Sequence, residues 1–422
     1  MLFRTPGARR SGRARVALAL LSLVLAGTAR GEDELPARAN VIAAGPWLLA
    51  PSLTVGWSND SNVFYQSRAL APSGDQVLHL LPEVRALLPF RNSEFEGRYR
   101  RDLVDYRETP LEGSGYQEFA SSLRLRFSTH DMLEITGAHT RGQAEALRFD
   151  GGELLFQGEA YRLNAWGVAL SRDVLGYRGY SLRAQRMDLN FDGATTVRFF
   201  DFRANSLEAE YREPVRPALS ILTTVRVESA DHFCRNTTPL GLVCPEVGVP
   251  FRTERSGMVL FGVRGALRAD QPFFLRIGRD VRRYASPVRV THDLVGDGQL
   301  TLRLTPSTRL FVDANRGLWS SFFLDNDFYR AQGVEARVER TGARRASVGG
   351  ILGFQASDYT QGTLEGARRR DRRVRVVAYA TLPFRERAGL RLSVERHRRS
   401  SNLEGFDYDG TVVFAGMVLG WF

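Results

Sequence analysis

The chain ends on the stretch YDGTVVFAGMVLGWF, residues Tyr408 to Phe422, and this stretch decides the fold. It carries no charged side chain after Asp409 and closes on an aromatic residue. A β-barrel that spans a membrane must pair its last strand with its first, because an open sheet edge would leave unpaired peptide groups in lipid. A long, uncharged terminal strand suits that closure. Phe422 is the expected C-terminal signal for the barrel-assembly machinery.

The other end of the chain has the organisation of a secretory signal. A basic region precedes an apolar core over residues 16–26, and small residues then favour cleavage before Glu32. The pair Arg9-Arg10 leaves a twin-arginine signal open as the weaker alternative. No later stretch is long and apolar enough to cross a bilayer as a helix. We predict a signal peptide over residues 1–31, a short periplasmic segment over residues 32–45 and an outer-membrane barrel over residues 46–422.

The net charge of the whole chain overstates how basic the mature protein is. The sequence has 58 basic and 47 acidic residues, and six of the arginines lie in residues 1–31, which contain no acid. The mature chain therefore has 52 basic and 47 acidic residues, a net charge of +5. Acids are spread along the chain, so the composition does not indicate a nucleic-acid partner.

The two cysteines, Cys234 and Cys244, lie in a segment rich in Pro, Gly, Thr and Asn. In an oxidising compartment they are expected to form a disulfide that closes this loop. A metal site needs more ligands than two thiolates, and His232 is the only histidine nearby. We therefore expect neither a metal nor another cofactor.

Alternation of apolar and polar residues marks strands along the whole mature chain. In LRLSVE, residues 390–395, the leucines and valine share one face and Arg391, Ser393 and Glu395 share the other. Segments of this kind run to ten residues and more, whereas strands of soluble proteins average about five or six. Tilted membrane strands need about nine to eleven residues. The pattern predicts an all-β, antiparallel, up-and-down transmembrane barrel.

We predict eighteen strands, separated by alternately short and long connections. The predicted strands cover residues 46–58, 77–90, 94–107, 116–128, 132–143, 160–174, 177–191, 197–212, 218–231, 252–268, 272–285, 293–305, 309–322, 328–340, 344–358, 371–384, 388–400 and 408–422. Short turns on the periplasmic side and long loops outside require an even number of strands. Sixteen is the alternative, because residues 77–90 contain two prolines and residues 344–358 alternate poorly.

Two stretches of the chain resemble a known family. The first strand followed by NDSNVF, residues 59–64, and the late run LRLSVERHRRSSN, residues 390–402, resemble the β-barrel porin-2 family of outer-membrane proteins. The resemblance implies an eighteen-stranded barrel associated with export of exopolysaccharide or capsule, partnered by a periplasmic polysaccharide-export protein. Gly420 departs from the pattern, since many barrels carry an aromatic or bulky apolar residue there.

Constellations typical of enzymes are missing from the sequence. The six histidines are scattered, and no HExxH, GxSxG or phosphate-binding loop occurs. Asp231-His232 at a loop mouth is the only pair that suggests a catalytic site, and an ordinary loop pair is the better interpretation. We predict a protein that is not an enzyme.

The charged face of the strands is expected to line a wet lumen. The lumen-facing candidates are Arg98, Arg100, Arg124, Arg126, Arg183, Arg226, Arg276, Arg303, Arg337, Arg375, Arg391, Glu228, Glu335 and Glu395. Arginine binds carboxylates and phosphates bidentately, so these side chains could guide a solute. The alternative is structural, with opposite charges on neighbouring strands bracing the wall. Both interpretations stay open at this point.

The leading functional hypothesis is a conduit for polysaccharide in the outer membrane of a Gram-negative bacterium, in contact with outer-membrane lipid. It rests on the family resemblance together with the strand pattern. A general or anion-leaning diffusion porin is the first alternative, since arginines dominate the predicted lumen. A structural barrel, or a surface receptor built on the loop over residues 232–251, is the second.

Overall fold

The computed structural model describes residues 41–63, 67, 72–108, 115–144, 147–148, 154–155, 159–174, 178–191, 201–233, 250–285, 288–321, 328–342, 345–362 and 368–420. The predicted signal peptide, both cysteines and Phe422 lie outside these residues. Nowhere in the described segments does a helix occur that is long and apolar enough to cross a membrane.

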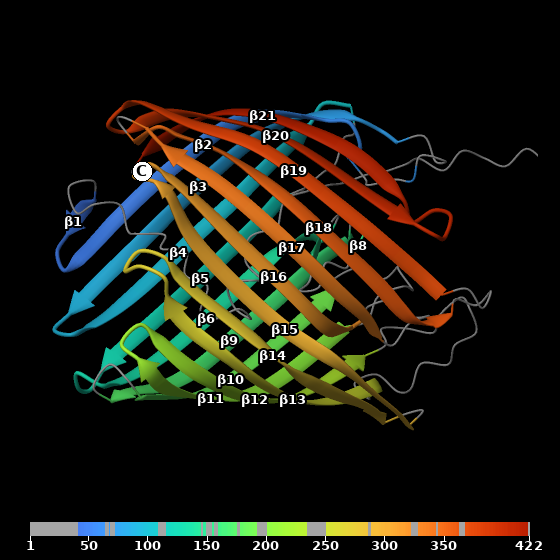
Figure 1. Cartoon of the computed structure of the whole chain (residues 1–422). Helices are drawn as coiled ribbons and strands as arrows, with labels where there is room; N and C mark the ends of the chain where they lie inside the picture. Colours follow the sequence, from blue (N-terminus) through green and yellow to red (C-terminus); the bar gives the residue numbers. More distant parts are fainter. Residues whose placement is uncertain are drawn as a thin grey trace, which may run out of the picture.

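Eighteen long antiparallel strands form one closed barrel, as the sequence predicts (Figure 1). They are β2 (Trp47–Asp60), β3 (Asp75–Phe90), β4 (Ser93–Tyr106), β5 (Gly115–Arg126), β6 (Asp131–Ala144), β9 (Glu159–Val174), β10 (Arg178–Phe191), β11 (Asp201–Arg216), β12 (Leu219–Phe233), β13 (Pro250–Ala266), β14 (Pro272–Ala285), β15 (Val288–Thr305), β16 (Thr308–Ser320), β17 (Phe328–Thr341), β18 (Ser347–Gly362), β19 (Arg368–Arg385), β20 (Ala388–Ser401) and β21 (Tyr408–Gly420). Three short strands, β1 (Ile42–Ala44), β7 (Leu147–Arg148) and β8 (Leu154–Leu155), add to these. Strand β1 pairs with the start of β2, so pairing begins within the segment expected to precede the barrel.

The barrel closes where β2 pairs with β21, in a register from Ser52 opposite Gly420 to Asp60 opposite Val412. Gly420 has a φ of 130°, which L side chains rarely adopt. A Cβ on Gly420 would also lie 2.4 Å from the carbonyl oxygen of Pro51. The glycine that departs from the family pattern is therefore required by the close approach of the first and last strands.

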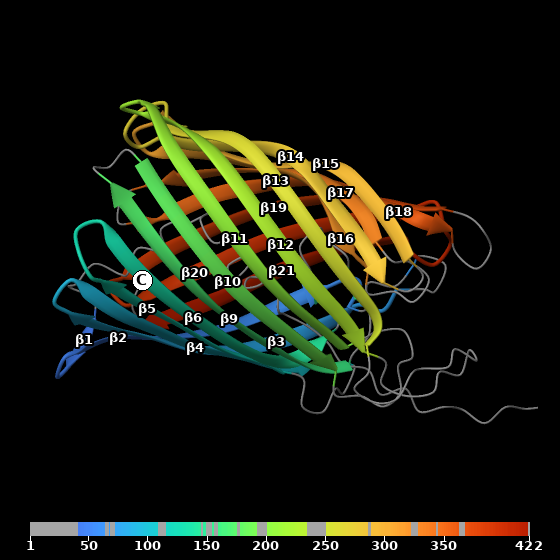
Figure 2. The same ribbon diagram turned by 90° about the horizontal axis from the view of Figure 1, so that it is seen from below.

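The two ends of the barrel differ. At one end, turns such as Arg91-Asn92 between β3 and β4 join neighbouring strands. The first barrel strand, β2, starts at this end and the last, β21, finishes there. At the other end, the connections include residues 61–74 and 402–407 (Figures 1 and 2). In outer-membrane barrels the short turns face the periplasm and the long loops face outward. We call these the turn end and the loop end.

Several predicted boundaries are wrong, and two of them show why. Strand β11 runs four residues further than predicted, because its ladder with β12 continues through Pro214 and a bulge before Arg216. Strand β15 starts at Val288 rather than at residue 293, so only residues 286–287 separate it from β14. The alternation of Val290, His292 and Leu294 on one face continues the strand where a loop was predicted.

The prolines that left a sixteen-stranded barrel open do not break β3. Pro82 lacks a backbone donor, and the ladder between β3 and β4 skips from Leu80 opposite Leu103 to Glu83 opposite Arg100. Pairing resumes on both sides of this gap. The strand survives because each of its faces still alternates and its ladder with β2 is continuous.

Candidate functional site

Exposure separates the two faces of the barrel wall. Large apolar side chains with more than half their surface exposed recur on alternate positions, such as Leu170 at 51%, Phe261 at 58% and Leu352 at 57%. Such side chains face the lipid in a membrane barrel. The intervening positions carry most of the charged groups, as the charge pattern of the sequence led us to expect. The interior of the closed sheet is therefore polar.

All fourteen predicted lumen-facing residues occupy the positions that alternate with the exposed apolar ones. They lie on β4 (Arg98, Arg100), β5 (Arg124, Arg126), β10 (Arg183), β12 (Arg226, Glu228), β14 (Arg276), β15 (Arg303), β17 (Glu335, Arg337), β19 (Arg375) and β20 (Arg391, Glu395). Contact of these side chains with a passing solute remains a prediction. Their contacts with one another divide them into two groups.

The first group consists of arginines that bind carboxylates on the wall. Arg98 Nη2 lies 2.8 Å from Glu118 Oε1 on the neighbouring strand. Arg124 contacts both Glu94 and Glu134, and its Nε lies 2.9 Å from Glu134 Oε1. The other pairs in this group are Arg226–Glu228, Arg276–Asp297, Arg276–Glu210, Arg303–Asp270, Arg375–Glu335 and Arg375–Glu395. Charges of opposite sign on adjacent strands stabilise the sheet, so these arginines brace the wall.

The second group has no carboxylate within ion-pair distance in the described part of the chain. Arg100 and Arg391 belong to it, and both point inward from β4 and β20. Strands β21, β2 and β3 lie between these two strands. Uncompensated arginines that face water attract anions, because their charge is not neutralised locally.

A buried charged cluster lies on the inner wall toward the loop end. Arg282 of β14 donates from Nε to Asp280 at 2.8 Å and from Nη1 to Glu254 at 2.5 Å. The side chains of Arg282, Glu254 and Asp280 are only 10%, 2% and 3% exposed. Ser320 at the end of β16 accepts from Arg282 Nη1 at 3.3 Å and donates to Glu254. We call these four residues the Arg282 cluster.

The ends of β16 and β17 lean over this inner wall. Pairing of β15 with β16 extends only to Gly296 opposite Arg316, so the last residues of β16 leave the ladder. Phe328 at the start of β17 then stacks on Tyr284 of β14 with a centroid distance of 5.6 Å. Arg252 Nη2 of β13 donates to the carbonyl oxygen of Ser321 at 2.6 Å. The lumen is therefore narrowed on this side by two strands that are not neighbours of β13 or β14.

A second inward contact comes from Val63 and Ser67 of the connection between β2 and β3. Val63 is fully buried against Val77 and Tyr106, which point inward from β3 and β4. Ser67 donates from its hydroxyl to Asp407 of the connection before β21 at 2.8 Å.

The residues of the family resemblance meet at the barrel closure. Asn62 donates from Nδ2 to the carbonyl oxygen of Asp409 at 3.0 Å, and its backbone N–H donates to Asp60 at 2.7 Å. The backbone N–H of Ser61 donates to the carbonyl oxygen of Thr411 at 3.0 Å. These contacts join the loop ends of the first and last strands. The motif thus has a structural role in closing the cylinder.

One arrangement resembles a hydrolase triad. The Ser58 hydroxyl lies 2.9 Å from His79 Nε2, and His79 Nδ1 lies 3.6 Å from Asp102 Oδ1. Their exposed fractions are only 3%, 6% and 0%. Acyl transfer also requires free N–H donors that can bind an oxyanion. The backbone N–H groups of Ser61, Asn62 and Val63, which follow Ser58 on the chain, are all bound to other oxygens. The arrangement therefore lacks both access and an oxyanion hole.

Asp231 and His232, the other catalytic candidate, point to opposite faces of β12. Asp231 accepts from the Thr253 hydroxyl at 2.9 Å, whereas His232 is buried and lies 3.3 Å from Arg252. They do not form a pair. Within the described residues no group of acids, histidines and cysteines could hold a metal ion.

Sequence reasoning missed the Arg282 cluster. Period two along β14 places Arg282 and Tyr284 on the same face as the predicted Arg276. Glu254 follows from the same rule on β13. No sequence signal pointed to Ser320, because a small polar residue at a strand end has no distinctive pattern.

No protein-family model and no curated protein matches the chain. Among solved structures, the outer membrane protein OpdK from Pseudomonas aeruginosa matches with a TM-score of 0.46 and 14% identity, over 88% of this chain and 99% of that chain. OpdO from the same organism has a TM-score of 0.48 and 11% identity, over 91% and 99%. The FrpB iron transporter from Neisseria meningitidis has a TM-score of 0.48 and 8% identity, over 83% and 62%. Similarities this distant carry no information about substrate.

Proposed function

We propose that the protein is a channel of the Gram-negative outer membrane that passes small polar solutes and prefers anions to cations. Barrels of sixteen to eighteen strands leave an aqueous channel unless something fills it. The preference rests on Arg100 and Arg391, which have no carboxylate within ion-pair distance in the described residues. Glu83 and Glu118, opposite Arg100 in the ladders, bind Arg85 and Arg98 instead. Arg126 and Arg337 also have no such partner within the described residues, so the inner wall carries an excess of unpaired positive charge.

Bilayer recordings test the proposal. The purified mature barrel is inserted into planar bilayers, and the reversal potential in a KCl gradient gives the ratio of anion to cation permeability. Arg100→Gln combined with Arg391→Gln should bring this ratio close to one while conductance persists. The matched control is Arg101→Gln with Arg398→Gln, because these exposed arginines lie on the same two strands and point outward. A wild-type barrel that never conducts, or an inner variant with unchanged selectivity, would refute the proposal.

Polysaccharide export is the second candidate, and the resemblance at residues 59–64 and 390–402 is what favours it. The contacts of Ser61 and Asn62 with the last strand give the first stretch a structural role without reference to a polymer. Deletion of the gene distinguishes the candidates. Loss of surface polysaccharide while the polymer is still synthesised would support export, and normal surface polymer would exclude it. A barrel that does not conduct in bilayers without a periplasmic partner would also support export.

A further inference from the structure

The outer wall carries arginines that the lumen does not explain. On β13 and β14, toward the loop end, Arg255 and Arg283 are exposed and lie directly opposite each other in the ladder. Arg279 lies on the same outward face of β14, two residues beyond Ile277. None of the three has a carboxylate partner within the described residues. Like charges that face each other across a ladder are destabilising, so an external anion is needed to balance them.

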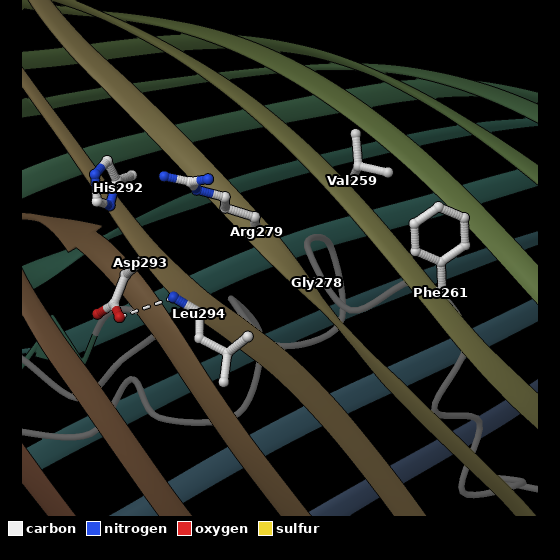
Figure 3. A pocket seen from close by; sticks show the side chains of 7 residues that line it. All are labelled: Val259, Phe261, Gly278, Arg279, His292, Asp293 and Leu294. Carbon is white, nitrogen blue, oxygen red and sulfur yellow. Dashed lines mark hydrogen bonds between the residues drawn. The ribbon is translucent and has the colours of Figure 1, made fainter.

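Arg279 borders a pocket on this outer surface. The pocket has a volume of about 430 Å³ and is lined by Val259, Phe261, Gly278, Arg279, His292, Asp293 and Leu294. Figure 3 shows Arg279 extending between His292 on one side and Val259 with Phe261 on the other. Phe261 and Leu294 are 58% and 53% exposed, so the pocket combines an apolar floor with a cationic rim.

The one carboxylate of the pocket does not neutralise that rim. Asp293 is bound by Arg316, whose Nη2 lies 3.2 Å from Oδ1, and by Arg330. It also accepts the backbone N–H of Leu294 at 2.8 Å. The Asp293 carboxylate therefore pairs with two arginines on β16 and β17. It does not neutralise the charge of Arg279, which is available to a bound anion.

Outward arginines nearby provide a contrast, since only β12 lies between β11 and β13. Arg186 and Arg203 on β10 and β11 both bind Asp188, with Nε to carboxylate distances of 2.9 and 2.8 Å. Exposure of arginine on the outer wall is thus not enough to leave it without a partner. At β13 and β14 no described acid lies within ion-pair distance of the three arginines, and the outward Asp231 of β12 binds the Thr253 hydroxyl instead.

We propose that Arg255, Arg279 and Arg283 bind the phosphate groups of an outer-leaflet phosphoglycolipid of the lipid A type, with an acyl chain in the pocket below. The loop end faces the outer leaflet, and Arg279 ends the apolar run of Leu275 and Ile277 on β14, with the exposed Val281 between Arg279 and Arg283. The arginines therefore overlap the outer edge of the apolar band, where long cationic side chains reach the lipid headgroups. Guanidinium groups bind phosphate bidentately. Val259, Phe261 and Leu294 match the chain of such a lipid, whereas inorganic phosphate would leave them unoccupied.

An open strip beside the arginines extends the apolar surface. Gly257 lies on the outward face between Arg255 and Val259, and a Cβ built on it meets no atom within 4 Å. A bulky side chain would fit there without disturbing the wall. The substitution Gly257→Leu therefore changes the space available to an acyl chain while keeping every charge.

The experiment measures lipid binding by the purified, folded barrel in zwitterionic detergent. A ligand that binds only the folded state raises the unfolding temperature, and the stabilisation grows with the logarithm of the ligand concentration relative to Kd. The probes are bisphosphorylated lipid A, its dephosphorylated form and inorganic phosphate. The test variant combines Arg255→Gln, Arg279→Gln and Arg283→Gln. The control combines Arg172→Gln, Arg178→Gln and Arg340→Gln, which removes three outward charges at the turn end.

The proposal predicts that lipid A stabilises the wild type and the control equally, and that the test variant binds at least about tenfold more weakly. Gly257→Leu should weaken lipid A binding as well. Equal binding by the test variant, equal stabilisation by the dephosphorylated lipid, or equal stabilisation by inorganic phosphate would each overturn it. Folding of every variant is checked by the mobility shift between unheated and heated samples. Should the triple variant not fold, Arg279→Gln against Arg279→Lys makes the same comparison. None of these outcomes depends on what passes through the lumen.

Discussion

Removal of Arg282 should destabilise the barrel far more than removal of an exposed arginine. In Arg282→Leu, the carboxylates of Glu254 and Asp280 stay buried, at 2% and 3% exposure, without their cation. Leaving a buried charge uncompensated costs about 3–5 kcal/mol. In the control, Arg178→Leu, the partner Glu213 is 37% exposed and Arg178 itself 52%, and such solvent-screened surface pairs contribute little. The two substitutions remove the same group, so the difference reports burial.

The assay is reversible denaturant unfolding of the barrel in lipid vesicles, followed by tryptophan fluorescence. Arg282→Leu should lower the free energy of unfolding by about 3–5 kcal/mol with an unchanged dependence on denaturant. Adding Glu254→Gln and Asp280→Asn to the same chain should restore most of that loss, because no unpaired charge then remains. A loss in Arg282→Leu no larger than that of Arg178→Leu would refute the reasoning, as would failure of the triple variant to recover.

Three further predictions follow from single positions. Gly420→Val should reduce the yield of folded barrel on heat-shift gels, because a φ of 130° and the carbonyl oxygen of Pro51 exclude a side chain where the barrel closes. Asp102→Asn should leave unfolding stability unchanged or raise it by about 1–3 kcal/mol, because both carboxylate oxygens are buried without a hydrogen-bond partner. Leu182→Arg, outward and 48% exposed, should cost about 2 kcal/mol or more, while Ser181→Arg on the inner face should cost about 1 kcal/mol or less in the same unfolding assay.

The strand count was predictable because the information is local. Alternation in a segment such as residues 390–395 fixes which side chains share a face, and turn residues mark where each strand ends. The features that could not be predicted depend on contacts between distant segments. The bulge after Pro214 and the early start of β15 arise from register with a neighbouring strand. The inward lean of β16 depends on Ser320 meeting β13 and β14, which adjacent residues do not indicate.

The sequence allowed us to predict which face of the wall each charged side chain occupies. It did not allow us to predict which carboxylate each arginine binds. Period two assigns Arg98 and Arg100 to the same face, yet one binds Glu118 and the other has no carboxylate. Nothing in the sequence separates them, and the register does not either: Glu118 lies directly opposite Arg100 in the ladder between β4 and β5, yet its carboxylate binds Arg98. The outward cluster at Arg279 was missed for a related reason. Arg282 and Arg283 are consecutive, so composition cannot show that one faces the lumen and the other the lipid.

The distribution of partners also bears on selectivity. An arginine that binds one or two wall acids contributes a dipole whose field falls off quickly, and it resists displacement because its hydrogen bonds are already made. A solute therefore gains little from such residues, however many line the barrel. Arg100 and Arg391 differ because no carboxylate lies within ion-pair distance of either in the described residues, so their donors are open to an entering anion. Substitution of these two residues should abolish the preference for anions and leave the conductance in place. That result would mean that the ion-paired arginines stabilise the wall, whereas the unpaired arginines determine the selectivity of the channel.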